Sequence, residues 1–164
     1  MHTQWKRLTV TLSAAALLCL GTQPALSHDH EHSHEAAGPA RLALDNGHKW
    51  ATDDSLRQGM TRIRDALNAE LPAIHAGKAT AEQYRALAQK TDGQIAFLFQ
   101  NCKLKPEADA MLHVVLADII AGANAMMGQD GGKAREGAEK IARALDNYGA
   151  YFAHPGWNGV KPAH

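Results

Sequence analysis

The chain has 164 residues, with 17 basic and 17 acidic side chains and a formal net charge of zero at pH 7. Because there is no basic surplus, the composition gives no indication of nucleic-acid binding. The length suits one ordinary domain once a predicted leader is removed, which argues against a second hydrophobic core.

Residues 1–27 have the pattern of a secretory signal peptide. Two basic residues precede an apolar run from Leu8 to Leu20, and Ala25 and Ser27 are the small residues that signal peptidase accepts. The run is shorter than the roughly 20 residues that span a bilayer, and no other membrane span is predicted. We therefore expect export to the periplasm, with cleavage after Ser27.

The cysteine content changes with that cleavage. The chain has two cysteines, of which Cys19 lies in the signal peptide and Cys102 in the mature protein. Disulfides are usual in oxidising compartments, so a single exported thiol calls for an explanation. Cys102 is predicted to be either a metal ligand or a small buried apolar side chain.

Residues 28–50 are predicted to form a flexible, histidine-rich arm. It begins with HDHEHSHE, which holds His28, His30, His32 and His34. If the mature chain starts at His28, a free amine with histidine in third place resembles the amino-terminal copper and nickel binding motif. Square-planar nitrogen coordination suits Cu(II) or Ni(II). The alternative is a solvated tract without fixed geometry.

Residues 51–157 are predicted to contain four amphipathic helices. Thr52 or Asp53 caps the first, which ends at Gly77. A capping box opens the second at Thr80, and its apolar period continues across Asp92-Gly93, which favours a continuous or kinked helix over a turn. The first two apolar stripes are Leu56, Met60, Ile63, Leu67, Leu71 and Ile74, then Tyr84, Leu87, Thr91, Ile95, Leu98 and Cys102.

The third helix is predicted to begin at Pro106, and the fourth runs from Ala134 until His154-Pro155-Gly156 stops it. Their stripes are Leu112, Val115, Leu116, Ile119, Ala123 and Met126, then Ala138, Ile141, Leu145, Tyr148 and Phe152. Short loops make sequential helices antiparallel, so the sequence predicts an all-α, up-down-up-down four-helix bundle. A short tail, 158–164, follows it.

This topology predicts that residues with ligand chemistry gather at one end of the bundle. They are Met60, Cys102, Asp109, His113 and His154. Singly, each has a structural explanation, such as core filling, helix-dipole stabilisation or a helix stop. Together, thioether, thiol and imidazole favour Cu(I), and zinc is the alternative metal because Cys, His and Asp all ligate it.

Two stretches resemble the cytochrome b562 family of periplasmic four-helix bundles. They are Leu56-Arg-Gln-Gly-Met60 and Ala138-Glu-Lys-Ile through Asn147-Tyr148. The resemblance implies the bundle fold, with Met60 at the position of the haem-ligating methionine. The position of the histidine ligand is held by Gly149, and His154 lies five residues further on. The stretch from Asn101 through His113 is similar to exported helical proteins associated with heavy-metal handling.

The sequence thus predicts a periplasmic copper-binding protein for sequestration or delivery, with a metal transporter or chaperone as its partner. No constellation of catalytic residues is recognised, so enzymatic activity is not expected. One alternative is a haem electron carrier using Met60 with His113 or His154. The other is a metal-free interaction module with Trp50, Tyr151 and Trp157 as a docking surface, although these rings are better suited to plugging the bundle end.

Overall fold

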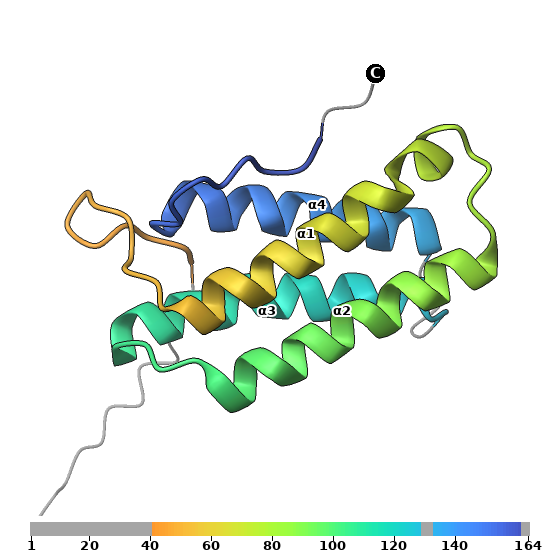
Figure 1. Cartoon of the computed structure of the whole chain (residues 1–164). Coiled ribbons are helices and arrows are strands. Elements are labelled where there is room, and N and C mark those ends of the chain that lie inside the picture. The colour runs from red at the N-terminus through yellow and green to blue at the C-terminus, as the bar shows by residue number, and fades with distance from the viewer. Residues whose placement is uncertain (1–40, 129–132, 162–164) are drawn as a thin grey trace, which may run out of the picture. The chain divides into compact units, whose positions relative to one another are not determined.

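The computed structural model describes residues 41–128 and 133–161, which fold into a helical bundle (Figure 1). Its helices are α1 (Asp54–His75), α2 (Ala81–Asn101), α3 (Pro106–Met126) and α4 (Ala134–Tyr151). No strand forms within these ranges, where only isolated bridges pair extended residues. The all-helical class is therefore confirmed. The predicted signal peptide, the four histidines of the arm and residues 162–164 lie outside the described residues.

The helix starts follow the predicted caps. Asp53 accepts a hydrogen bond from the Leu56 amide at 2.6 Å, and Thr80 and Gln83 form the reciprocal capping box. Helix α2 continues through Gly93 without a break. This glycine is exposed and keeps helical geometry. The short connections make neighbouring helices antiparallel, as Figure 1 shows.

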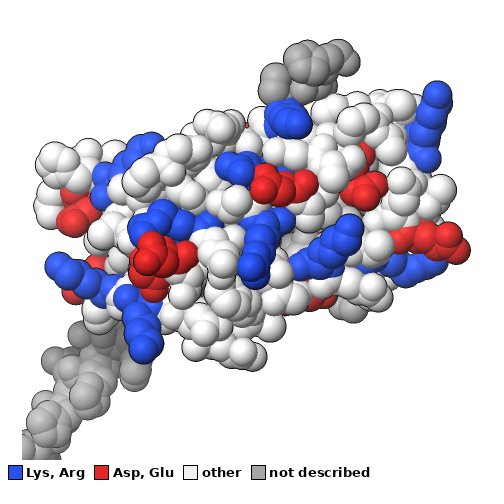
Figure 2. Space-filling model, viewed as in Figure 1, with Lys and Arg blue, Asp and Glu red and all other residues white. Residues whose placement is uncertain are grey.

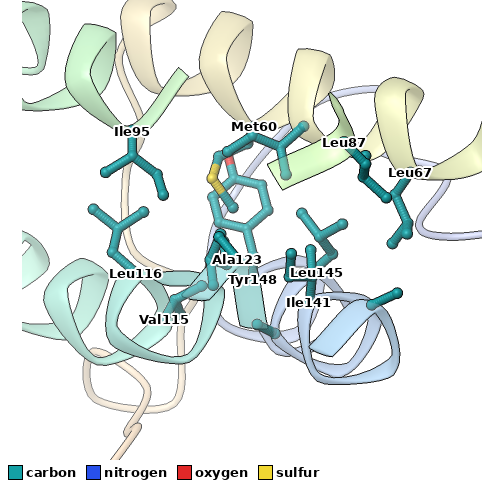
Figure 3. Close-up of a cluster of buried hydrophobic side chains, with 14 of the residues drawn as sticks. Met60, Leu67, Leu87, Ile95, Val115, Leu116, Ala123, Ile141, Leu145 and Tyr148 are labelled. Carbon is teal, nitrogen blue, oxygen red and sulfur yellow. The ribbon is translucent and has the colours of Figure 1, made fainter. Parts of the chain in front are cut away.

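The predicted apolar stripes form one core between the four helices. Leu56, Ile63, Leu98, Ile119 and Leu145 are among its fully buried side chains. Figure 3 shows such residues from all four helices pointing inward. Burying this apolar surface is the main stabilisation of a bundle, at roughly 25 cal/mol per Å².

Glycines let the helices approach closely at two places. A Cβ on Gly59 of α1 would lie 2.4 Å from the Leu98 side chain of α2. On α3 and α4, a Cβ on Gly122 would lie 2.6 Å from the carbonyl oxygen of Gly137, and one on Gly137 would lie 2.5 Å from that of Gly122. These contacts leave no room for a larger side chain, so they fix the spacing of both helix pairs.

The segments that precede α1 and follow α4 in the sequence pair with each other at one end of the bundle. The Trp50 amide donates to the Tyr151 carbonyl, and the Ala153 amide donates to that of Trp50, both at 2.8 Å. Residues 152–161, the C-terminal strap, then return along α1, where the Lys161 amide donates to the Asn68 side chain at 2.9 Å. Residues 41–50, which were expected to belong to the flexible arm, therefore contact the bundle.

Helix α3 differs from its neighbours in hydropathy. Among the described helices it is the one long and apolar enough to cross a membrane, with a mean hydropathy of 1.3 over its best 18-residue window. Only 39% of that window is buried. Its buried side packs against α2 and α4, and a core helix of a bundle passes the same test.

Candidate metal centre

The candidate site lies at the Asp53 end, where α1 and α3 begin and α2 and α4 end. Asp53 connects the elements here with both of its carboxylate oxygens. Oδ1 caps α1 through the Leu56 amide, and Oδ2 accepts a hydrogen bond from the Lys103 amide at 2.6 Å. The loop that follows Cys102 is therefore tied to the start of α1.

Three predicted ligands, Cys102, Asp109 and His113, line one small pocket between α2 and α3. Its volume is about 170 Å³, and its remaining walls are apolar, from Leu98, Phe99, Leu112 and Leu116. Cys102 is the C-cap residue that follows α2, whereas Asp109 and His113 lie one turn apart on α3. The structure thus brings together a thiol, a carboxylate and an imidazole from two helices.

The imidazole of His113 is held in one orientation by the helix that carries it. Its Nδ1 lies 2.9 Å from the Asp109 carbonyl oxygen and 3.4 Å from Oδ2 of the same residue. A carbonyl oxygen only accepts hydrogen bonds, so this contact assigns the proton to Nδ1 and leaves the Nε2 lone pair free in the neutral ring. Metal-binding histidines are commonly oriented in this way.

The thiol of Cys102 is held in its protonated form. Burial, followed by the charges of Asp53 and Asp109, raises the pKa of the Cys102 thiol to about 12. Because the thiolate is the metal-binding form, a metal ion has to displace this proton. Metal affinity at this pocket is therefore expected to increase with pH.

The donor side chains share a pocket without forming a closed coordination shell. Across residues 41–128 and 133–161, no three His, Cys, Asp or Glu side chains lie close enough together to hold a metal ion. The His113 side chain is 54% exposed and that of Asp109 is 48% exposed. Asp109 and His113 are therefore accessible to a metal ion from solvent.

Met60 is not brought to this pocket. It is 0% exposed and belongs to the hydrophobic core, where Figure 3 shows it pointing inward among side chains of the other helices. The residues that line the pocket do not include it. The observed surroundings of Met60 are those of a core residue, for which a flexible thioether is well suited.

His154 lies in the C-terminal strap and makes different contacts. Its Nδ1 is 2.9 Å from the Tyr148 hydroxyl, and its ring centre is 5.0 Å from that of Trp157. Burial lowers the pKa of His154, and the nearby charges of Arg57 and Arg64 lower it further. It is absent from the lining of the Cys102 pocket, so these contacts give it a role in holding the strap.

The position expected to hold a haem-ligating histidine is Gly149, which packs against Trp157. A Cβ on Gly149 would lie 2.5 Å from Nε1 of Trp157. The guanidinium of Arg64 also lies over the Trp157 ring, 5.0 Å from the ring centre. The glycine at this position therefore allows the strap to close against α4.

Two contributions to this end of the bundle were missed by sequence reasoning. Phe99 is 57% exposed, and its ring centre lies 5.9 Å from that of His113. Its signal was an aromatic residue off the buried stripe, three positions before Cys102. The bond from Lys103 to Asp53 joins residues 50 positions apart, and no local pattern indicates it.

Comparison of the chain with protein-family models gives no match. Searches of curated proteins and of solved structures likewise give none.

Proposed function

We propose that the mature protein is an exported copper-binding protein that sequesters or delivers the metal. One site is the arm, with His28, His30, His32 and His34 as donors for Cu(II). The other is the bundle pocket, with Cys102 and His113 as donors for Cu(I). The observation that carries the second site is that a thiol and an oriented imidazole line the same small pocket.

The chemistry of the donors favours Cu(I) at the bundle. Thiolate and imidazole are suitable ligands for Cu(I), whereas a carboxylate is a harder donor. Asp109 already contributes by holding His113 Nδ1 through its backbone carbonyl. Zinc, by contrast, would use the Asp109 carboxylate directly.

This difference allows the metal to be identified. Asp109→Asn retains the carbonyl that orients His113, so Cu(I) affinity should change little. Zinc affinity should fall if the carboxylate is a ligand. A larger loss for Cu(I) than for zinc would contradict the proposed assignment.

The alternative functions have less support from the described residues. Haem ligation would require Met60 to leave the core, and its candidate partner His154 is engaged by the Tyr148 hydroxyl. Two rings of the aromatic docking surface are used within the protein, because the Trp50 indole donates to the Ala43 carbonyl at 2.7 Å and Arg64 lies over Trp157. We therefore propose neither of these functions.

The decisive experiment has two parts. Metal analysis of untagged protein from its native compartment should find copper. Competition titration with a Cu(I) chelator should then show affinity reduced by roughly tenfold or more in Cys102→Ser and His113→Ala, because each loses a ligand. Met60→Leu is the matched control, since it conserves core volume and should leave the affinity unchanged. Equal affinity in Cys102→Ser and the parent protein would overturn the bundle site.

A further inference from the structure

The pocket around Cys102 has apolar walls of two kinds. Its inner walls are core side chains that are at most 2% exposed: Leu98, Leu112 and Leu116. Phe99 lines the same pocket but is 57% exposed, and it shares the solvent side with Asp109 and His113. The apolar wall between the pocket and solvent is therefore the Phe99 ring.

Large apolar side chains are rare on the surface of this bundle. Figure 2 shows basic and acidic side chains interspersed over the face that carries α1 and α2. Among the described residues, the exposed large hydrophobic side chains are Leu44 and Phe99. A single exposed apolar residue is not evidence of a site. Phe99 differs from Leu44 because it lines a pocket that holds metal donors, whereas Leu44 does not.

The Phe99 ring is held beside both proposed donors. It lies three residues before Cys102, whose amide donates to the Leu98 carbonyl at 2.9 Å, so the helical register continues to the thiol. Residues three apart on a helix lie on the same face. On the α3 side, the centre of the Phe99 ring lies 5.9 Å from that of His113, with the two planes inclined at 44°. An ion bound between thiol and imidazole would therefore have this ring as its neighbour toward solvent.

An apolar wall in this position favours Cu(I) over divalent ions. Cu(I) is satisfied by a few soft donors such as thiolate and imidazole. Zinc is almost always four-coordinate in proteins and completes its shell with further side chains or water. A ring without donor atoms keeps water from the free coordination positions, which costs zinc more than it costs Cu(I). The apolar shell of a metal site also controls solvent access and redox potential, so the ring protects Cu(I) from oxidation.

We propose that Phe99 makes the pocket selective for Cu(I), by covering the bound ion against water and dioxygen. This inference rests on the proposed copper site at Cys102 and His113. The ring acts through its bulk and its lack of donor atoms and is not itself a ligand. Phe99→Ala should therefore remove the cover, whereas Phe99→Leu should keep it, because leucine is also large and apolar.

The cover is testable in the metal-free protein. Iodoacetamide has to reach the Cys102 thiol from solvent, so the folded Phe99→Ala protein should be alkylated at pH 8 several-fold faster than the parent. Phe99→Leu should react at the parent rate. Leu44→Ala truncates the other exposed large hydrophobic side chain and is the matched control, which should also keep the parent rate. Equal rates in Phe99→Ala and the parent would overturn the cover, whether or not the protein binds copper.

Metal binding by the mature protein tests the selectivity. Competition titrations with a Cu(I) chelator and with a zinc chelator give the two affinities, and Cys102→Ser measures the metal held outside the pocket. The ratio of Cu(I) to zinc affinity should fall roughly tenfold or more in Phe99→Ala. In air, one electron passes from Cu(I) to dioxygen, leaving Cu(II) and superoxide. Timed quenching with a Cu(I)-specific chelator should show this loss to be faster in Phe99→Ala than in the parent, Phe99→Leu or Leu44→Ala.

The outcomes separate this inference from the proposed function. If the parent holds Cu(I) no more tightly than Cys102→Ser, the copper site fails and the selectivity of Phe99 fails with it. If Cys102→Ser loses Cu(I) but Phe99→Ala matches the parent in affinity ratio and oxidation rate, the copper site stands and the role of Phe99 is overturned. If Phe99→Leu behaves like Phe99→Ala, the aromatic face itself attracts the cation, and the role as an apolar cover is overturned.

Discussion

The environment of Cys102 makes its thiol resistant to ionisation at neutral pH. Because the pKa of this thiol is raised to about 12, native protein should react with iodoacetamide at pH 8 roughly tenfold or more slowly than protein unfolded in guanidinium chloride. Mass spectrometry of timed samples measures both rates. Free cysteine in the same solutions is the control for the denaturant. Equal rates in native and unfolded protein would show that neither burial nor the carboxylates suppress the thiolate.

His154 should make stability depend on pH in the acidic range. Its pKa is lowered in the folded protein, so the unfolded chain binds the proton more readily. Stability is therefore complete above the ordinary histidine pKa of 6.5 and is lost as pH falls through the lower folded value. Thermal melts of His154→Gln should show a smaller loss between neutral and acidic pH than melts of the parent protein. At neutral pH this variant should be less stable by about 1 kcal/mol, because the Tyr148 hydroxyl loses its partner.

At the scale of a helix, glycine has opposite consequences in α2 and α4. Gly93→Ala should stabilise the protein by about 1 kcal/mol, because no atom lies within 4 Å of the added Cβ and alanine favours the helix. Gly149→Ala should destabilise it by about 1–3 kcal/mol through contact with Trp157. Denaturant unfolding measures both changes.

A double-variant cycle identifies the cause of the second effect. In a Trp157→Ala background the strap no longer covers Gly149, so the cost of Gly149→Ala should largely disappear. If the cost persists in that background, Trp157 is not its source.

The helices were predictable because their signals are local. The capping box at Thr80 and the apolar period across Gly93 each depend on residues close together in the sequence, and the structure confirms both. The strap was not predictable, because it depends on contacts between distant residues, such as that of Lys161 with Asn68. The helix topology alone predicted that the metal donors lie at one end of the bundle. Side-chain packing, which the topology does not give, separates the pocket around Cys102 from the buried Met60.

For the whole molecule, the two proposed copper sites should be separable. Deleting residues 28–35 should remove Cu(II) binding to the arm while leaving Cu(I) binding to the bundle, since the donor sets prefer different oxidation states. Cu(I) should raise the melting temperature of both proteins, because it binds only the folded form of the pocket. Melting curves under reducing conditions measure this shift. Its loss on arm deletion would mean that the arm and the pocket share one coordination sphere.

The pairing of the strap with residues near Trp50 also gives the protein an optical reporter. Trp5 belongs to the predicted signal peptide, so Trp50 and Trp157 would be the tryptophans of the mature chain. Trp50 lines one pocket together with Lys103 and Leu104, which follow Cys102, and Trp157 contacts the last turn of α4. Intrinsic fluorescence therefore reports on the Asp53 end of the bundle and is silent about the loop near Gly77. A change in emission when copper is added would locate copper binding, or a structural response to it, near this end without any attached label.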